Sequence, residues 1–177
     1  MIKVLAIDGG GIRGIVPALF LKRLEDDIER PVSEIFDYIV GTSTGGILAL
    51  ALCKPSAGGG PAFPAEDLVR FYEEDGPKIF GLKRGIILAA RRPRYHADGI
   101  DGGLNAKFGM THLSECRANV VVTAYDMTNR TPKVFLSWKA KEMKGEDFLL
   151  RDIARATSAA PTYFSPVQIA DRQNNAQ

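Results

Sequence analysis

The stretch from Phe36 to Leu52 constrains the fold of this 177-residue chain more than any other part of its sequence. It opens with the run Phe36–Val40, whose β-forming apolar residues predict a buried strand. The run Ile47–Leu52 follows almost at once, and its unbroken apolar character predicts a buried helix. The corner between them, Gly41–Gly46, therefore leads from a strand directly into a helix, which predicts an α/β fold.

Ser43 stands at this corner, with Gly41 two places before it and Gly45 two places after it. A Gly-x-Ser-x-Gly pattern between a strand and a helix is the context of a nucleophile elbow. We expect the sharp reversal to leave no room for side chains at the two glycines, so that Ser43 is strained and its hydroxyl projects outward. The competing interpretation is that Ser43 only caps the helix and the glycines only mark a turn.

A second glycine cluster, Asp8–Gly14, follows the run Val4–Ile7, which we predict to be a central strand. After the cluster, apolar residues recur at helical spacing from Ile15 to Ile28, with charged residues on the other face. The cluster is therefore predicted to be a loop from a strand to a helix. The free N–H groups of such a loop can form an anion-binding nest, backed by the N-terminus of the helix.

Two functions compete for this loop. The pattern Gly9-x-Gly11-x-x-Gly14 matches a dinucleotide fingerprint, but that fingerprint needs an acidic residue at the end of the next strand, which here ends without one at Ser43. A nucleotide site would also leave the Ser43 corner unexplained. Because successive parallel strands tend to be neighbours, we expect the loop to lie beside Ser43, where its N–H donors would form an oxyanion hole.

With these two motifs in this order, the sequence resembles the patatin-like phospholipase family. The resemblance is carried by Asp8–Gly14, by Gly41–Gly46 and by a later block, Ala154–Phe164. It extends from Met1 to about Ile169. It implies a lipid acyl hydrolase with a three-layer α/β/α fold, in which a mainly parallel central sheet is flanked by helices on both faces.

The resemblance also implies the roles of individual residues. Family members use a Ser–Asp dyad and no catalytic histidine, which makes Ser43 the nucleophile at an elbow shaped by Gly41 and Gly45. The oxyanion hole is assigned to the backbone amides of the glycine loop and a neighbouring arginine, namely Gly9, Gly10, Gly11 and Arg13.

The aspartate of the dyad is where the sequence departs from the family pattern. The resemblance implies an Asp-Gly-Gly or Asp-Gly-Ala motif after the Ala154–Phe164 block, and the sequence as far as Gln177 has none there. Asp101 precedes the block, in a polar, glycine-rich stretch that favours a plain turn. Asp171 follows the apolar run Val167–Ala170, which would suit a strand, but it lacks the following glycine. We expect 1–177 to be a single domain truncated at its C-terminus, with the dyad aspartate beyond its last residue and Asp171 as the fallback.

Further elements follow from the same patterns. We predict a surface loop at Lys54–Pro64, a short helix over Leu68–Tyr72 that ends at Asp75–Pro77, a helix over Leu104–Leu113 broken at Gly109, a hairpin of Val120–Tyr125 and Lys133–Ser137, and a buried helix within Phe148–Ala160. Cations flank the apolar segment Ile86–Ala90, which could lie against an anionic membrane surface. We favour the simpler interpretation of a solvated basic face, because such patches are common.

Composition bounds the partners and the compartment. The net charge of +2 implies no nucleic-acid partner, and the 45% hydrophobic content is ordinary for a soluble globular protein. The two cysteines, Cys53 and Cys116, offer no disulfide framework or metal-ligand set, and we expect buried thiols in a reducing compartment. We find no signal peptide and no membrane-spanning segment, which predicts a cytoplasmic protein open to peripheral contact with a membrane.

We therefore expect hydrolysis of fatty-acyl esters of membrane glycerolipids or phospholipids, with no metal or organic cofactor. Three alternatives remain open. A Ser-His-Asp esterase or thioesterase would need His96 or His112, and neither has a neighbouring acid in a strand-end context. A nucleotide-binding module would use the glycine loop. A catalytically inactive lipid-binding fragment would lack the dyad aspartate.

Overall fold

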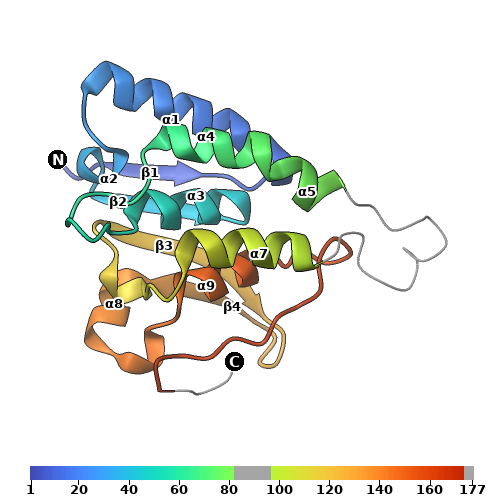
Figure 1. Cartoon of the computed structure of the whole chain (residues 1–177). Helices are drawn as coiled ribbons and strands as arrows, with labels where there is room; N and C mark the ends of the chain where they lie inside the picture. Colours follow the sequence, from blue (N-terminus) through green and yellow to red (C-terminus); the bar gives the residue numbers. More distant parts are fainter. Residues whose placement is uncertain (82–96, 174–177) are drawn as a thin grey trace.

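The computed structural model describes residues 1–81 and 97–173 (Figure 1). Within them the strands β1 (Val4–Ile7), β2 (Tyr38–Thr42), β3 (Asn119–Asp126) and β4 (Thr131–Leu136) form one sheet in the order β1-β2-β3-β4. The first three strands are parallel, and β4 pairs with β3 in the predicted hairpin. This mostly parallel sheet with its helices confirms the predicted α/β class, and among the described residues the longer helices lie on one face of the sheet.

The register places the two predicted motifs at the same edge of the sheet. Ile7 at the end of β1 pairs with Gly41 near the end of β2, so the glycine loop and the serine corner leave the sheet side by side, as predicted. The prediction that β1 is a central strand is wrong within the described residues, because β1 is an edge strand and β2 has a strand on each side. The chain leaves β2 through a long helical connection and returns as β3 on the side away from β1.

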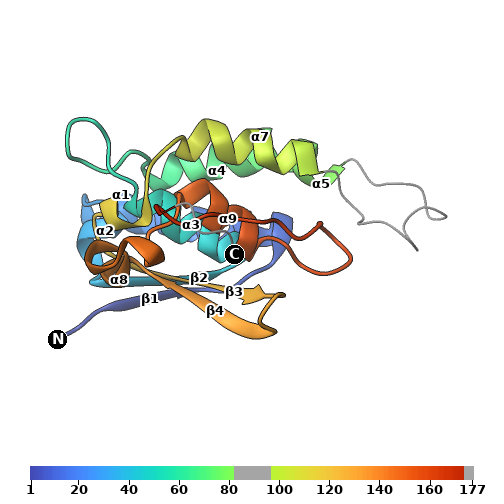
Figure 2. The same ribbon diagram turned by 90° about the horizontal axis from the view of Figure 1, so that it is seen from below.

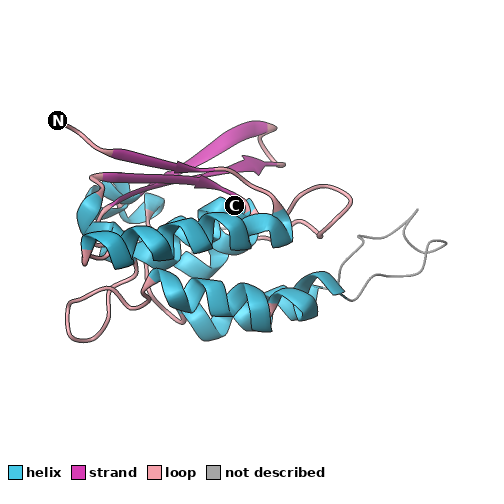
Figure 3. Cartoon of the chain, turned by 90° about the horizontal axis from the view of Figure 1, so that it is seen from above, coloured by secondary structure: helices cyan, strands magenta, loops and turns pink. Residues whose placement is uncertain are grey.

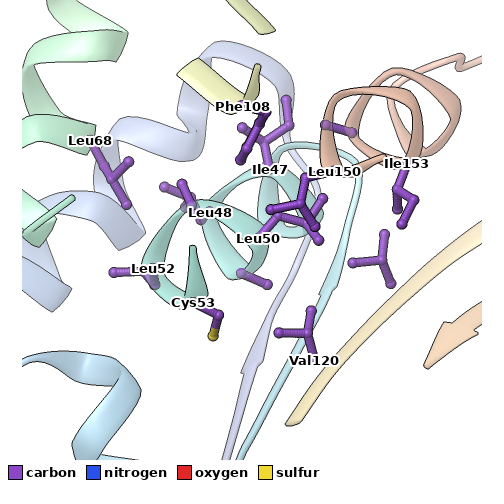
Figure 4. Close-up of a cluster of buried hydrophobic side chains, with 14 of the residues drawn as sticks. Ile47, Leu48, Leu50, Leu52, Cys53, Leu68, Phe108, Val120, Leu150 and Ile153 are labelled. Carbon is purple, nitrogen blue, oxygen red and sulfur yellow. The ribbon is translucent and has the colours of Figure 1, made fainter. Parts of the chain in front are cut away.

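The helices of the described residues are α1 (Ile15–Ile28), α2 (Val32–Ile35), α3 (Thr44–Cys53), α4 (Ala65–Glu74), α5 (Gly76–Gly81), α7 (Ala97–Phe108), α8 (Ser137–Glu142) and α9 (Leu150–Thr157), with single 3-10 turns η1 (Gly11–Gly14), η2 (Leu113–Glu115) and η3 (Lys144–Glu146). Figures 2 and 3 show the longer helices gathered on one face of the sheet. Helix α3 lies at the centre, and every one of its residues is buried. Figure 4 shows how its side chains pack against those of β3, α4, α7 and α9, which makes α3 the axis of the core.

Helix α7 differs from the sequence prediction. The sequence predicts a plain turn in the polar, glycine-rich stretch around Asp101, but the residues from Ala97 onward form the first half of the helix. The buried side chains Ile100, Leu104 and Phe108 follow one another at helical spacing, so packing against the core outweighs the low helix propensity of the glycines between them. The predicted break at Gly109 is confirmed, because this residue has a φ of 54° and lies just beyond the last helical residue.

The predicted end of the helix at Asp75–Pro77 is confirmed, because α4 ends at Glu74 with Asp75 as its C-cap, and the separate helix α5 begins at Gly76. Two smaller expectations are corrected. The apolar residues of α1 do not form a single buried face, because Ala18 and Leu21 are buried while Phe20 is 78% exposed. Residues 167–170 form no strand, and only an isolated bridge joins Asp171 to Phe148.

The face of the sheet opposite the helices is apolar and accessible. Val4, Tyr125 and Val134 point to this side, and they are 56%, 62% and 42% exposed. Beside it, a groove of about 420 Å³ separates β1 from α1 and contains the exposed side chains of Val16 and Phe20. A parallel sheet usually has both faces covered, so this surface is unusual for a free protein.

Several other expectations concern loops, thiols and membranes. Lys54–Pro64 is a loop, as predicted. Cys53 and Cys116 are buried free thiols, and burial raises the pKa of Cys53 to about 12. No helix in the described ranges has the length and apolar character needed to cross a membrane. The candidate membrane-facing segment around Ile86–Ala90 and the residue His96 lie outside the described residues.

Candidate active site

Ser43 occupies the corner between β2 and α3 in a conformation that few non-glycine residues adopt. Its φ is 56° and its ψ is −123°, so it belongs to neither the strand nor the helix. The two flanking glycines are required by space. A Cβ at Gly41 would overlap the backbone of Gly45, and a Cβ at Gly45 would overlap the backbone of Ile7. The chain therefore turns too tightly for larger residues, and strain is concentrated on the serine.

The glycine loop packs directly against this corner. A Cβ at Gly9 would lie 3.1 Å from both the Ser43 Cβ and the carbonyl oxygen of Thr42, so only glycine allows this approach without a shift of its neighbours. Gly11 has a φ of 58°, in the left-handed region that favours glycine. The backbone N–H of Arg13 donates to the Gly10 carbonyl over 3.2 Å, and its side-chain Nε donates to the same oxygen over 3.4 Å. Arg13 thus holds the shape of the loop.

Ser43 and the glycine loop share one cavity of about 460 Å³. Its other walls come from α3, α4, α5, α7 and the turn after α9, and they are mostly apolar. The main contributors are Ile47, Phe71, Tyr72, Ile79, Ile100 and Phe164. A serine packed against the glycine loop and facing a mostly apolar cavity of this size suits a substrate that joins an apolar chain to a polar group beside the serine.

Tyr72 adds a polar contact at the base of the cavity that the sequence did not reveal. Its hydroxyl hydrogen-bonds the side chain of Thr44, the residue that follows the serine. Burial raises the pKa of Tyr72 to about 12, so the phenol is neutral at physiological pH. Gly14 lies against this pair, because a Cβ there would overlap both side chains. Tyr72 therefore supports the first turn of α3.

The candidate acids do not reach this cavity. Asp171 is buried beside Phe148, and its carboxylate accepts the N–H of Gln173 over 2.7 Å. Asp101, expected in a plain turn, lies in α7 and pairs with the Arg155 Nε over 2.7 Å. Neither lines the cavity that contains Ser43, and no other Asp, Glu or His whose side chain the structure describes does so. The side chains of His96 and Asp98 are outside this described set.

The second histidine belongs to a separate cluster. His112 Nδ1 lies 3.7 Å from the Asp147 Oδ2, and the Ser114 hydroxyl donates to the same oxygen over 2.8 Å. In a serine hydrolase the histidine stands between serine and acid, whereas here the serine bonds the carboxylate directly. None of these three residues lines the cavity that contains Ser43, and the cluster joins η2 to the loop before α9.

The fold and the site together define a class of protein. It is an α/β protein whose first two parallel strands bring a glycine-rich loop against a strained serine between strand and helix. A family model described as patatin-like phospholipase matches residues 5–174. The chain belongs to this family, which confirms the resemblance seen in the sequence.

Three relatives illustrate the similarity. The chain is 40% identical over 172 residues to patatin-like protein 1 of Oryza sativa subsp. indica, which covers 92% of this chain and 42% of the relative. It is 36% identical to patatin-like protein 2 of Arabidopsis thaliana and 35% identical to patatin-07 of Solanum tuberosum, over 100% and 99% of this chain. The chain spans 47% and 46% of those two relatives, so it covers less than half the length of each of the three.

Proposed function

We propose that this chain forms the nucleophile-bearing part of a lipid acyl hydrolase that cleaves fatty-acyl esters of membrane glycerolipids or phospholipids. One observation carries the proposal: Ser43, strained at a φ of 56°, faces an apolar cavity of about 460 Å³ that the glycine loop also lines. Membership of the patatin-like phospholipase family supports the same activity.

In the proposed reaction, the Ser43 oxygen attacks the acyl carbonyl and its proton passes to a general base. The negative charge that develops on the carbonyl oxygen is stabilised by the N–H groups of Gly9, Gly10 and Gly11 and by the N-terminus of α3. The alcohol of the lipid leaves with a proton, and water then releases the fatty acid from the acyl-enzyme. The walls of the cavity hold the acyl chain during both steps.

We assign the base to an aspartate outside residues 1–177, which would complete the Ser–Asp dyad. Support comes from the cavity, which no described Asp or Glu side chain lines, and from the relatives, which are more than twice as long as this chain. Within the chain, His96 and Asp98 are the rivals to be tested. If neither they nor a longer chain supply a base, the protein is the inactive lipid-binding alternative.

The first prediction concerns the nucleophile. In a version of the protein that includes the family's remaining length, Ser43→Ala should abolish release of fatty acid from phospholipid vesicles and labelling by a fluorophosphonate probe. The matched control is Ser56→Ala, which changes a serine in the Lys54–Pro64 loop and should leave both signals intact. Labelling that survives in Ser43→Ala would refute the assignment.

The second prediction separates the rival chemistries. The double variant His96→Ala, His112→Ala should lose no more than about threefold in turnover, because an aspartate dyad needs no imidazole. A loss as large as that of Ser43→Ala would instead establish a Ser-His mechanism. Tight binding of NAD or ATP that competes with the acyl substrate would favour the nucleotide-binding alternative.

A further inference from the structure

The backbone amide of Ser43 has a partner far away in the sequence. The Ser43 N–H donates to the Thr157 hydroxyl over 2.7 Å, across a separation of 114 residues. The same hydroxyl donates its own proton to the carbonyl of Thr123 in β3, also over 2.7 Å. A single buried side chain thus joins the serine corner, the end of α9 and the central part of the sheet.

The surroundings fix Thr157 in this role. Its side chain is largely buried, with the whole residue 8% exposed. A Cβ at Gly46 would lie 3.0 Å from the threonine methyl group, so this glycine in α3 makes room for the methyl to pack closely. A β-branched side chain has few rotamers, and a packed methyl leaves the hydroxyl directed at the corner.

We propose that Thr157 is a positioning residue that holds Ser43 in its strained conformation. The corner cannot satisfy the Ser43 amide through the strand or helix ladder, so the amide depends on a side-chain acceptor. Only a group that accepts and donates at once can bond Ser43 and Thr123 together, which a hydroxyl does and a methyl does not. The consequence for turnover rests on the function proposed above, whereas the structural part does not.

The proposal also bears on the oxyanion hole. Because the Ser43 N–H is already engaged, it is not free to stabilise the developing charge. That task is left to the glycine loop and to the amides that follow Ser43 at the start of α3. In this proposal the Ser43 amide has a structural function, through Thr157, and the neighbouring amides have the catalytic one.

The experiment compares amide hydrogen exchange, measured by NMR, in the wild type and two variants of the chain. Thr157→Val keeps the shape and removes both hydrogen bonds, and it should speed exchange of the Ser43 amide by about tenfold relative to the amides of β2. Thr157→Ser retains the hydroxyl and should stay within about threefold of the wild type. Equal exchange at Ser43 in Thr157→Val and the wild type would overturn the proposal.

A matched control distinguishes positioning from general stability. The Ser137 hydroxyl, fully buried, accepts the N–H of Val120 over 2.9 Å in the same sheet. Ser137→Ala should lower stability as Thr157→Val does, but leave the exchange of Ser43 relative to β2 unchanged. If Thr157→Val does not fold, Gly46→Ala takes its place, because its new methyl would lie 3.0 Å from both the Thr157 methyl and a Val122 methyl, and displacing Thr157 should speed exchange at Ser43 relative to β2. Unchanged exchange at Ser43 in Gly46→Ala would then be the refuting result.

Turnover provides the catalytic readout. In an active, longer version, Thr157→Val should lower kcat by about tenfold with little change in KM, and Thr157→Ser should restore most of it. If the wild type shows no hydrolysis at all, the proposed function fails while the exchange data still decide the structural claim. If exchange of the Ser43 amide is faster in Thr157→Val but kcat is unchanged, the hydrogen bond holds the corner without contributing to catalysis. The positioning role is then refuted.

Discussion

Gly45 shows at the scale of one residue how little freedom the serine corner has. A methyl group at this position would overlap the carbonyl of Ile7, which is backbone and cannot move aside. We predict that Gly45→Ala lowers the free energy of unfolding by about 3 kcal/mol or more, which corresponds to a fall in Tm of roughly 6 to 12 °C for a domain of this size. Thermal unfolding followed by circular dichroism measures the change.

The matched control is Gly102→Ala in α7, where a Cβ would have no neighbour within 4 Å. Alanine is the better helix former, so this variant should gain up to about 1 kcal/mol. Equal stability of the two variants would show that the corner relaxes more easily than its geometry indicates.

The sequence predicted the serine corner because the crowding is local. Gly41 and Gly45 lie within two residues of Ser43, and the strand and helix on either side have clear apolar patterns. Thr157 could not be predicted, although it lies in the Ala154–Phe164 block that signals the family. A sequence gives no indication of which backbone amide a hydroxyl will meet 114 residues away.

At the scale of elements, one ion pair joins α7 to α9. The Arg155 side chain is 7% exposed, and it donates to Asp101 and to the Ser165 carbonyl over 2.7 and 3.0 Å. We predict that Asp101→Asn lowers the free energy of unfolding by about 1–3 kcal/mol, because the cation stays buried without its counter-charge. The exposed pair Arg70–Glu66 in α4 is the control, and Glu66→Gln should cost less than about 0.5 kcal/mol. Similar small losses in both variants, measured by denaturant unfolding, would contradict the prediction.

The same helix shows why a sequence pattern can be read incorrectly. The glycines of 97–104 favour a turn locally, whereas the spacing of Ile100, Leu104 and Phe108 favours a helix. The glycines predict a turn, whereas the tertiary contacts of α7 with α9 favour the helix. The position of β1 at the sheet edge was likewise beyond prediction, since strand order depends on pairing between distant segments.

At the scale of the whole molecule, association in solution should depend on the open sheet face and on the side of β1 that pairs with no other strand among residues 1–81 and 97–173. Val4 on the open face is 56% exposed, and Phe20 in the groove between β1 and α1 is 78% exposed. An accessible apolar edge strand invites pairing with another chain. We predict concentration-dependent association of the chain, which the double variant Val4→Lys, Phe20→Glu should weaken without loss of Tm.

Sedimentation velocity measures this association. The control is Met110→Lys, which changes a 68% exposed residue that follows α7 in the chain. Association that persists in the double variant, or that falls equally in the control, would show that the open face is not responsible.

The hydrogen bond between Ser43 and Thr157 also determines when the serine corner can form during synthesis of the chain. Contacts between distant residues form late, because the entropy cost of closing a long loop comes before the contact stabilises the chain. A ribosome that adds about 5–20 residues per second needs roughly 6 to 23 s to travel the 114 residues from one partner to the other. During that interval β1, β2 and the glycine loop already exist as nascent chain, while the serine amide has no acceptor. The serine corner is therefore completed only once α9 has been synthesised and docked, so shorter nascent chains carry the motif without the hydrogen bond between Ser43 and Thr157.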